Sequence, residues 1–246
     1  MDHLGWRMKF GLLGPSTNTI VQPDMDDMRP VGVTNHYGRI EIPGMSVASN
    51  EDFLRLVAYI QDNTLHAIDV LKTCEMDAMV MGMSATTFWD GRQGAEAYLK
   101  VLQDRAGVPV SCGSFSSEAA LNLYCARRIA FLSPYFEVAN AQVRRFFQDC
   151  GFTVVRDLCL ERPSPVQIAH TTDAMCREAI LKLDGDDVDA IVQVGTNLSM
   201  VKLAAAAEIF LGKPVIAINA ATYWHALRAA GIDDRMSGFG TLLSHH

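Results

Sequence analysis

The chain has 246 residues, of which 49% are hydrophobic and 20% are charged, and its formal net charge is −7. This composition is typical of a globular protein with a large core, in one domain or two small ones. The negative charge argues against nucleic acid as a partner, because phosphate binding needs a basic surface. No apolar run reaches the roughly 18 residues that predict a membrane span. The six cysteines form no CxxC or CxxH pattern, which argues against a metal site and favours a reducing cytoplasm.

Short apolar runs alternate with amphipathic stretches along the chain. The runs predict strands over 9–16, 77–83, 108–112, 128–135, 152–160, 189–195 and 213–219. The amphipathic stretches predict helices over 50–74, 93–107, 116–128, 137–151, 170–185, 200–212 and 221–231. This alternation predicts an α/β fold with parallel sheets flanked by helices. The stretch from Pro23 to Ser49 has no regular pattern, and we expect a loop that covers the site.

Two segments of the chain resemble each other. "DAMVMGMSATTF" begins at Asp77 and "DAIVQVGTNLSM" begins at Asp189, and both run from a buried strand into a turn of small polar residues. Two further pairs of segments recur in the same order, which is typical of duplicated halves. We therefore expect two pseudo-symmetric halves over 9–115 and 116–224, with 225–246 packing on the first half and the active site in the cleft between them.

The turns after these strands predict an anion-binding site. Ligands of open α/β sheets bind at the carboxyl ends of the strands, and in a duplicated fold those ends can face each other. Hydroxyl groups, amides and free backbone N–H groups are enriched in the turns 14–19, 82–87, 133–135 and 195–197. Such donors can bind a carboxylate or stabilise an enediolate, here with no lysine or arginine in the turns.

These turns resemble those of the aspartate/glutamate racemase superfamily, in its branch of arylmalonate decarboxylase and maleate cis–trans isomerase. "PSTNT" (15–19) is similar to the Pro-Ser-Ser-Asn-Thr turn of maleate isomerases, and "MGMSATTFWDG" (81–91) to a segment of the decarboxylase. "SPYFEVAN" (133–140) carries the family tyrosine at Tyr135, and "VGTNL" (194–198) matches the turn of the second half. The resemblance covers roughly 9–231.

The sequence departs from this branch at its thiols. The resemblance implies a catalytic cysteine at the end of each repeated strand in the racemases and the isomerase, and at the second strand alone in the decarboxylase. In this sequence Gly82 and Gly195 occupy both positions. Two-base racemisation and a covalent cysteine adduct are therefore not expected. Because relatives carry a side chain at both positions, we expect that neither glycine needs a positive φ.

The resemblance and the turns together predict the site residues. Ser84, Tyr135 and His170 are the candidates to replace the missing thiol as acid or base. Each also has a structural reading, as a helix cap, a packing tyrosine and a structural histidine respectively. The predicted substrate-binding residues are Pro15, Ser16, Asn18, Gly82, Met83, Thr86, Gly195, Thr196 and Asn197.

The predicted activity is that of a cofactor-independent lyase or isomerase acting on a small malonate- or maleate-like carboxylate. The enediolate would be stabilised as in the decarboxylase. A maleate-type isomerase, a hydratase or hydrolase using bound water, and a non-catalytic carboxylate-binding protein are the alternatives. We expect no cofactor, metal, nucleic acid or membrane partner. A homo-oligomer is left open, and the expected location is the cytoplasm.

Overall fold

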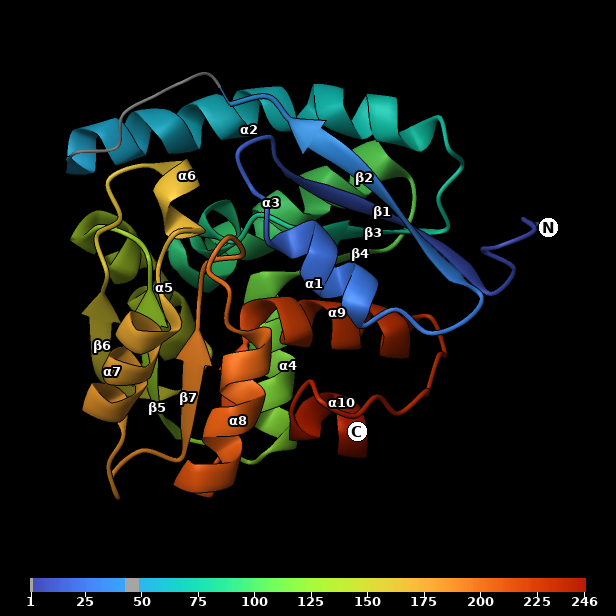
Figure 1. Cartoon of the computed structure of the whole chain (residues 1–246). Helices are drawn as coiled ribbons and strands as arrows, with labels where there is room; N and C mark the ends of the chain where they lie inside the picture. Colours follow the sequence, from blue (N-terminus) through green and yellow to red (C-terminus); the bar gives the residue numbers. More distant parts are fainter. Residues whose placement is uncertain (1, 43–48) are drawn as a thin grey trace.

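Two four-stranded parallel sheets form the frame of the protein (Figure 1). The structure is a computed structural model that describes residues 2–42 and 49–246. The first sheet has the order β2-β1-β3-β4, with β1 (Met8–Pro15), β2 (Val33–Ile40), β3 (Ala78–Met81) and β4 (Val110–Cys112). The second has the order β6-β5-β7-β8, with β5 (Arg128–Ser133), β6 (Thr153–Cys159), β7 (Ala190–Gln193) and β8 (Val215–Ala217). The equivalent orders confirm the prediction of an α/β fold with two similar halves.

Helices flank both sheets. The first half contains α1 (Val21–Asp27), α2 (Asn50–Lys72), the short 3₁₀ helix η1 (Ala85–Phe88), α3 (Gly91–Ala106) and α4 (Gly113–Leu123). The rest of the chain contains α5 (Glu137–Asp149), α6 (Pro165–Ile168), α7 (Asp173–Leu183), α8 (Val201–Leu211), α9 (Ile218–Ala229) and α10 (Thr241–His245). None of the helices in the described part of the chain has the length and apolarity needed to cross a membrane.

The two Asp-Ala repeats perform the same structural task. The Asp77 carboxylate accepts a hydrogen bond of 2.8 Å from the Lys9 N–H, where β1 begins. The Asp189 carboxylate accepts one of 2.7 Å from the Arg128 N–H, where β5 begins. Each aspartate thus joins the start of its own strand to the neighbouring strand. The repeat in the sequence therefore reflects equivalent strand pairs in the two halves.

The stretch from Pro23 to Ser49 was expected to be a loop, and this prediction was wrong for most of its described residues. It contains most of α1 and the whole of β2, while 43–48 lie outside the described residues. β2 pairs with β1 alone and forms the edge of the sheet. Its central side chains, such as Thr34 and Asn35, are only partly buried. An edge strand of this kind has no continuous apolar run, so its sequence does not show the usual strand signal.

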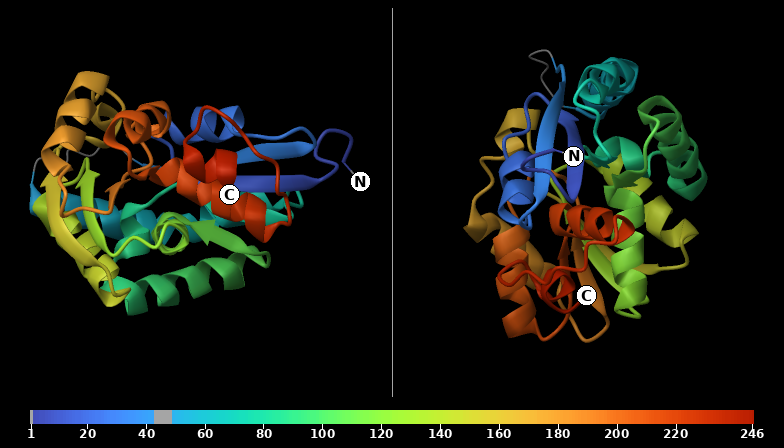
Figure 2. Two further views of the ribbon diagram at one scale, coloured as in Figure 1. Left: turned by 90° about the horizontal axis from the view of Figure 1, so that it is seen from below. Right: turned by 90° about the vertical axis from the view of Figure 1, so that its right-hand side faces the viewer.

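The C-terminal segment returns to the first half. Helix α9 packs against β3 and β4, and α10 packs against α9 (Figure 2). Tyr223 of α9 contacts Phe10 of β1 edge to face, with 5.7 Å between the ring centroids. Arg7, just before β1, forms an ion pair with Asp234. The segment on the first sheet thus includes all of α9, and the expected boundary between 224 and 225 falls inside this helix.

Candidate active site

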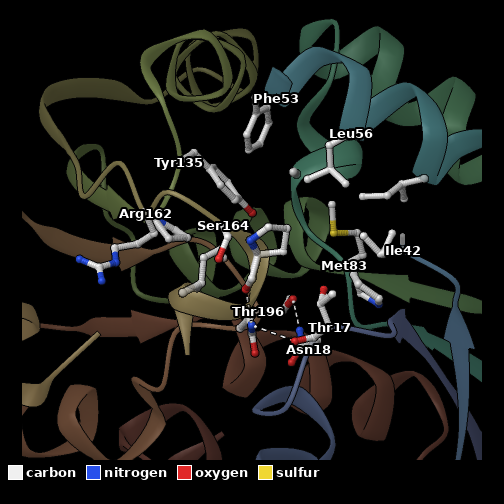
Figure 3. A pocket seen from close by; sticks show the side chains of 18 of the residues that line it. Thr17, Asn18, Ile42, Phe53, Leu56, Met83, Tyr135, Arg162, Ser164 and Thr196 are labelled. Carbon is white, nitrogen blue, oxygen red and sulfur yellow. Dashed lines mark hydrogen bonds between the residues drawn. The ribbon is translucent and has the colours of Figure 1, made fainter. Parts of the chain in front are cut away.

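A pocket of about 620 Å³, counted to its open mouth, lies where the carboxyl ends of the two sheets face each other (Figure 3). The first half contributes the turn after β1, the start of η1 and one face of α2. The second half contributes the turns after β5 and β7, and the segment after β6. Seven predicted site residues line it, namely Pro15, Asn18, Met83, Tyr135, Gly195, Thr196 and Asn197.

Direct hydrogen bonds join the turns of the two halves. The Thr196 hydroxyl donates to the Gly82 carbonyl at 2.8 Å. The Asn18 amide donates to the Thr196 Oγ1 at 3.0 Å. The Oδ1 of Asn18 accepts from the N–H groups of Ile20 and Val21, at the start of α1. The two strand-end turns therefore meet, as expected from the repeat, and Thr196 is the residue that connects them.

The Asn197 side chain is also engaged within the protein. Its Oδ1 accepts a hydrogen bond of 3.0 Å from the Thr19 N–H. Its Nδ2 donates to the Pro165 carbonyl at 2.8 Å. Asn18 and Asn197 thus hold the turns together, and their amides already have protein partners. A ligand in the pocket would therefore meet chiefly the backbone of these turns.

Backbone N–H groups are the free donors of the pocket. The Leu198 N–H donates to the Gly195 carbonyl at 3.1 Å and closes a β-turn around Thr196 and Asn197. The central N–H groups of such a turn have no partner inside it. Within the described ranges, the N–H groups of Met83, Thr196 and Asn197 donate to no protein group. Free N–H groups on pocket-lining residues are the kind of donor from which oxyanion-binding sites are built.

Tyr135 and Ser84 form a buried hydroxyl pair. Their oxygen atoms lie 2.7 Å apart, and the Tyr135 ring packs on Phe53 with 5.5 Å between centroids. Burial raises the pKa of the Tyr135 hydroxyl far above its usual range, and the bond to Ser84 opposes this shift only in part. Tyr135 is therefore neutral at ordinary pH, so it can donate a hydrogen bond or a proton.

The wall that faces these donors is apolar. Phe53, Leu56, Val57 and Ile60 lie on one face of α2 and line the pocket. Ser49 caps this helix by accepting a hydrogen bond from the Asp52 N–H. One side of the pocket thus presents hydrogen-bond donors while the other is apolar, and low polarity of this kind strengthens electrostatic interactions.

Comparison of the sequence with known protein families identifies the family of this chain. The profile of the family described as arylmalonate decarboxylase matches residues 18–243. The chain belongs to the arylmalonate decarboxylase family. Membership supports an enzyme that isomerises or decarboxylates a small carboxylate.

Several known proteins resemble this member of the arylmalonate decarboxylase family over its whole length. Maleate isomerase from Pseudomonas putida is 26% identical, covering 96% of this chain and 97% of the relative. A Nocardia farcinica maleate cis-trans isomerase mutant with a covalently bound succinylcysteine intermediate has a TM-score of 0.87 at 19% identity, covering 97% and 99% of the two chains. A liganded double mutant of arylmalonate decarboxylase has a TM-score of 0.80 at 17% identity, covering 97% and 100%. At 19% and 17% sequence identity, these two structures show that the fold is similar and carry no further conclusion.

Twelve residues that line the pocket of this arylmalonate decarboxylase family member were not predicted, and one of them is charged. Arg162 lines the pocket, although the four strand-end turns contain no lysine or arginine. Its Nε is buried without a hydrogen-bond partner, and its guanidinium extends away from Tyr135 (Figure 3). Arg162 follows the end of β6, and the rule that ligands bind at strand ends could have indicated it. Arg162 is the one charged residue among the described residues that line the pocket.

Five predicted residues do not line the pocket. His170 is exposed beyond α6, so the structure gives it no contact with a ligand there, and its predicted acid–base role lacks a geometric basis. Ser16 accepts a hydrogen bond from the Ile42 N–H. Thr86 is fully buried. Ser84 and Gly82 lie behind the pocket surface. Ser84 is hydrogen-bonded to the Tyr135 hydroxyl, and the Gly82 carbonyl accepts from the Thr196 hydroxyl.

The two glycines at the family thiol positions differ in geometry. Gly195 has a φ of +103°, and a Cβ built there would lie 2.4 Å from the Pro134 Cδ. Gly82 has no positive φ, and its Cβ would lie 3.1 Å from the Leu13 carbonyl and from Val21. The expectation that neither position needs a positive φ was therefore wrong for Gly195.

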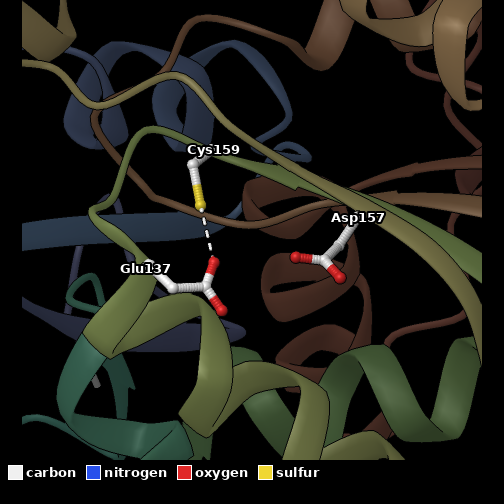
Figure 4. A group of neighbouring side chains, drawn as sticks. All are labelled: Glu137, Asp157 and Cys159. Atoms are coloured by element: carbon white, nitrogen blue, oxygen red, sulfur yellow. Dashed lines mark hydrogen bonds between the residues drawn. The ribbon is translucent and has the colours of Figure 1, made fainter.

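A second group of ligand-type side chains lies outside the pocket, namely Glu137, Asp157 and Cys159 (Figure 4). Arg144 pairs with both carboxylates, at 3.1 Å from Glu137 and 2.8 Å from Asp157. Burial, reinforced by Glu137, raises the pKa of Cys159 to about 12. Because a thiol binds metal as thiolate, this group is an ion-pair network with a protonated thiol beside it.

Proposed function

We propose that the protein is a cofactor-independent decarboxylase of malonate-like acids that carry an apolar substituent. The observation that supports this most directly is the division of the pocket into an apolar wall from α2 and a set of free N–H and hydroxyl donors. One carboxylate of the substrate would bind to the N–H groups of Met83, Thr196 and Asn197. The substituent would pack against Phe53 and Leu56.

The proposed reaction requires one bond to break and one to form. The bond between the α-carbon and the second carboxylate breaks, and its electron pair moves into the remaining carboxylate as CO2 leaves. The resulting enediolate carries its charge on the oxygens that face the N–H donors, where it is stabilised most. A proton then adds to the α-carbon. We assign this proton to the Tyr135 hydroxyl, which Ser84 holds in place at 2.7 Å. Solvent that enters through the open mouth of the pocket then returns a proton to the Tyr135 oxygen.

A cis–trans isomerase is the second candidate, favoured by the 26% identity to Pseudomonas putida maleate isomerase. Glycine at both 82 and 195 argues against the isomerase, because covalent addition to the double bond needs a nucleophile at these turns. No thiol lies on either turn in the sequence.

The deciding experiment is turnover by the purified protein in D2O, followed by NMR. Phenylmalonate, methylphenylmalonate, malonate and maleate are compared at equal concentration. We expect loss of CO2 from the two aryl compounds, with one deuterium at the α-carbon, and little reaction with malonate. Fumarate from maleate without decarboxylation would support the isomerase. Binding of all four compounds without any reaction would indicate a carboxylate-binding protein.

Alkylation of the cysteines is expected to leave turnover unchanged. No cysteine in the described part of the chain lines the pocket, and burial raises the pKa of Cys112 at the end of β4. The exposed Cys125 should react first. The measurement is phenylmalonate turnover after iodoacetamide treatment, with mass spectrometry to show which thiols are modified. Inactivation in step with one thiol, prevented by a bound carboxylate, would contradict the proposed mechanism.

A further inference from the structure

A partly buried carboxylate supports the pocket from behind. Asp24 lies on α1, and its Oδ2 accepts a hydrogen bond of 2.8 Å from the Asn219 Nδ2 of α9. The same nitrogen donates to the Thr196 carbonyl at 3.0 Å. Asn219 is almost fully buried. A single amide thus connects a carboxylate of the first half to the turn that carries two of the free N–H donors.

Thr196 is held on two sides by this arrangement. Its hydroxyl is bound between Asn18 and the Gly82 carbonyl, and its carbonyl is bound by Asn219. The Thr196 carbonyl shares its peptide plane with the Asn197 N–H, so the bond from Asn219 sets the direction in which that N–H points. Because a preorganised donor stabilises an oxyanion only in the correct direction, the contacts of Asn219 bear on ligand binding.

We propose that Asp24 is a positioning residue of this pocket, which in its ionised form holds the Asn219 amide and through it the Thr196 turn, and which releases both when protonated. The link to turnover rests on the proposed function, whereas the link to ligand binding does not.

The Asn219 side-chain amide can adopt two orientations, one for each protonation state of Asp24. Its Oδ1 is buried and has no hydrogen-bond partner in the described part of the chain. An ionised Asp24 can only accept, so it binds the Nδ2 as observed. A protonated Asp24 can donate to the Oδ1 once the amide turns over. That rotation moves the Nδ2 away from the Thr196 carbonyl, which then loses its donor.

The surroundings of Asp24 place its titration in the accessible range. Burial raises the pKa of Asp24 to about 6, and the bond from Asn219 lowers it in part. The charged groups that act on it are Asp27 of its own helix, which raises the pKa, and Lys202 of α8, which lowers it. α9 faces it with the neutral Asn219, and β2, which also packs on α1, adds no charge to the shift.

The pKa shift also sets the sign of the effect on stability. The pKa in the folded chain lies above the ordinary 3.8, so ionisation of Asp24 opposes folding. The stabilising contribution is complete below 3.8 and is lost as the pH rises through about 6. Asp24→Asn should therefore melt at a higher temperature than the wild type above about pH 6, although its pocket is not better organised.

The test compares wild type, Asp24→Asn, Asp24→Leu and the control Asp26→Asn, which alters an exposed aspartate of the same helix bonded to Asn35. The probe is phenylacetate, whose carboxyl has an ordinary pKa near 4 and stays ionised through the range. Its dissociation constant is measured from about pH 8 to about pH 5, where Asp24 changes charge. The backbone NMR signal of Thr196 is followed in the same samples without ligand.

We expect wild type and Asp26→Asn to lose about tenfold in affinity as the pH falls through this range, with the Thr196 signal moving in parallel. Asp24→Asn keeps an acceptor but cannot ionise, so its affinity should be independent of pH and its Thr196 signal should not titrate. Asp24→Leu should bind about tenfold more weakly at every pH. If Asp24→Leu does not fold, the comparison of wild type with Asp24→Asn still tests the role of Asp24.

A wild-type Thr196 signal and affinity that do not change with pH would overturn the proposal. An Asp24→Asn variant that titrates like wild type would do the same. If phenylmalonate is not turned over while Thr196 titrates as described, only the proposed function fails, and Asp24 remains the residue that positions the pocket.

Discussion

Tyr135→Phe is expected to lower kcat/KM for phenylmalonate by about 10²–10³-fold, within the usual range for loss of a positioned general acid. The substitution removes the hydroxyl that lies 2.7 Å from Ser84 and keeps the ring that packs on Phe53. Most of the loss should appear in kcat, because the hydroxyl acts on charge that develops during the reaction. Steady-state kinetics and deuterium incorporation at the α-carbon provide the measurement.

The matched control for this variant is Tyr124→Phe. The Tyr124 hydroxyl forms a hydrogen bond of 2.6 Å with the Thr241 Oγ1, away from the pocket. Both variants therefore lose a hydrogen bond between two hydroxyl groups, and each should lower the free energy of unfolding by about 1–2 kcal/mol. Only Tyr135→Phe should lose activity. Equal kinetics in the two variants would exclude the Tyr135 hydroxyl from the reaction.

Gly195→Ala is expected to lower the free energy of unfolding by about 3 kcal/mol or more, since it combines backbone strain with a steric clash. The φ of Gly195 is +103°, and the added Cβ would lie 2.4 Å from the Cδ of Pro134 and 2.6 Å from its Cγ. Pro134 is joined to Tyr135, so a shift of the proline would also move the hydroxyl pair. Chemical denaturation measures the stability, and phenylacetate affinity reports the pocket.

Substitutions at two other glycines separate the effect of backbone strain from the effect of the steric clash. Gly212 also has a positive φ of +65°, but a Cβ there would meet no atom within 4 Å, so Gly212→Ala should show the backbone effect alone, about 1 kcal/mol. Gly82→Ala has no positive φ and a nearest contact of 3.1 Å, so it should cost less than Gly195→Ala. If Gly195→Ala is as stable as Gly212→Ala, then Pro134 moves aside without strain. In that case the steric clash is not the reason why position 195 is glycine.

This result bears on the thiols of the family. Introducing cysteine at 82 and 195 together would be a simple way to test two-base chemistry if both turns tolerated a side chain. The structure predicts that Gly82→Cys folds and that Gly195→Cys does not fit without movement of Pro134. Glycine at 195 is thus part of a turn shape that a side chain would change.

The sequence by itself determined the architecture and most of the strand-end turns. Strand and helix periodicity, and the repeated Asp-Ala pairs, depend on contacts within a strand or with its neighbour, as Asp77 and Asp189 show. Because parallel strands end on one edge, the turns with Asn18, Tyr135 and Thr196 could be assigned to one pocket before the structure. This is the part of the site that local chemistry encodes.

Only the tertiary structure decided what surrounds these turns. The apolar wall comes from α2, which carries no local signal that distinguishes it from an ordinary amphipathic helix. Arg162 follows a strand end, but only the packing of the two halves brings it to the pocket. His170 has a suitable side chain but lies at the surface, and Asp24 has an unremarkable sequence environment but lies against Asn219. Such contacts join segments far apart in the chain. They depend on how the halves pack together, which periodicity and propensity along the sequence do not specify.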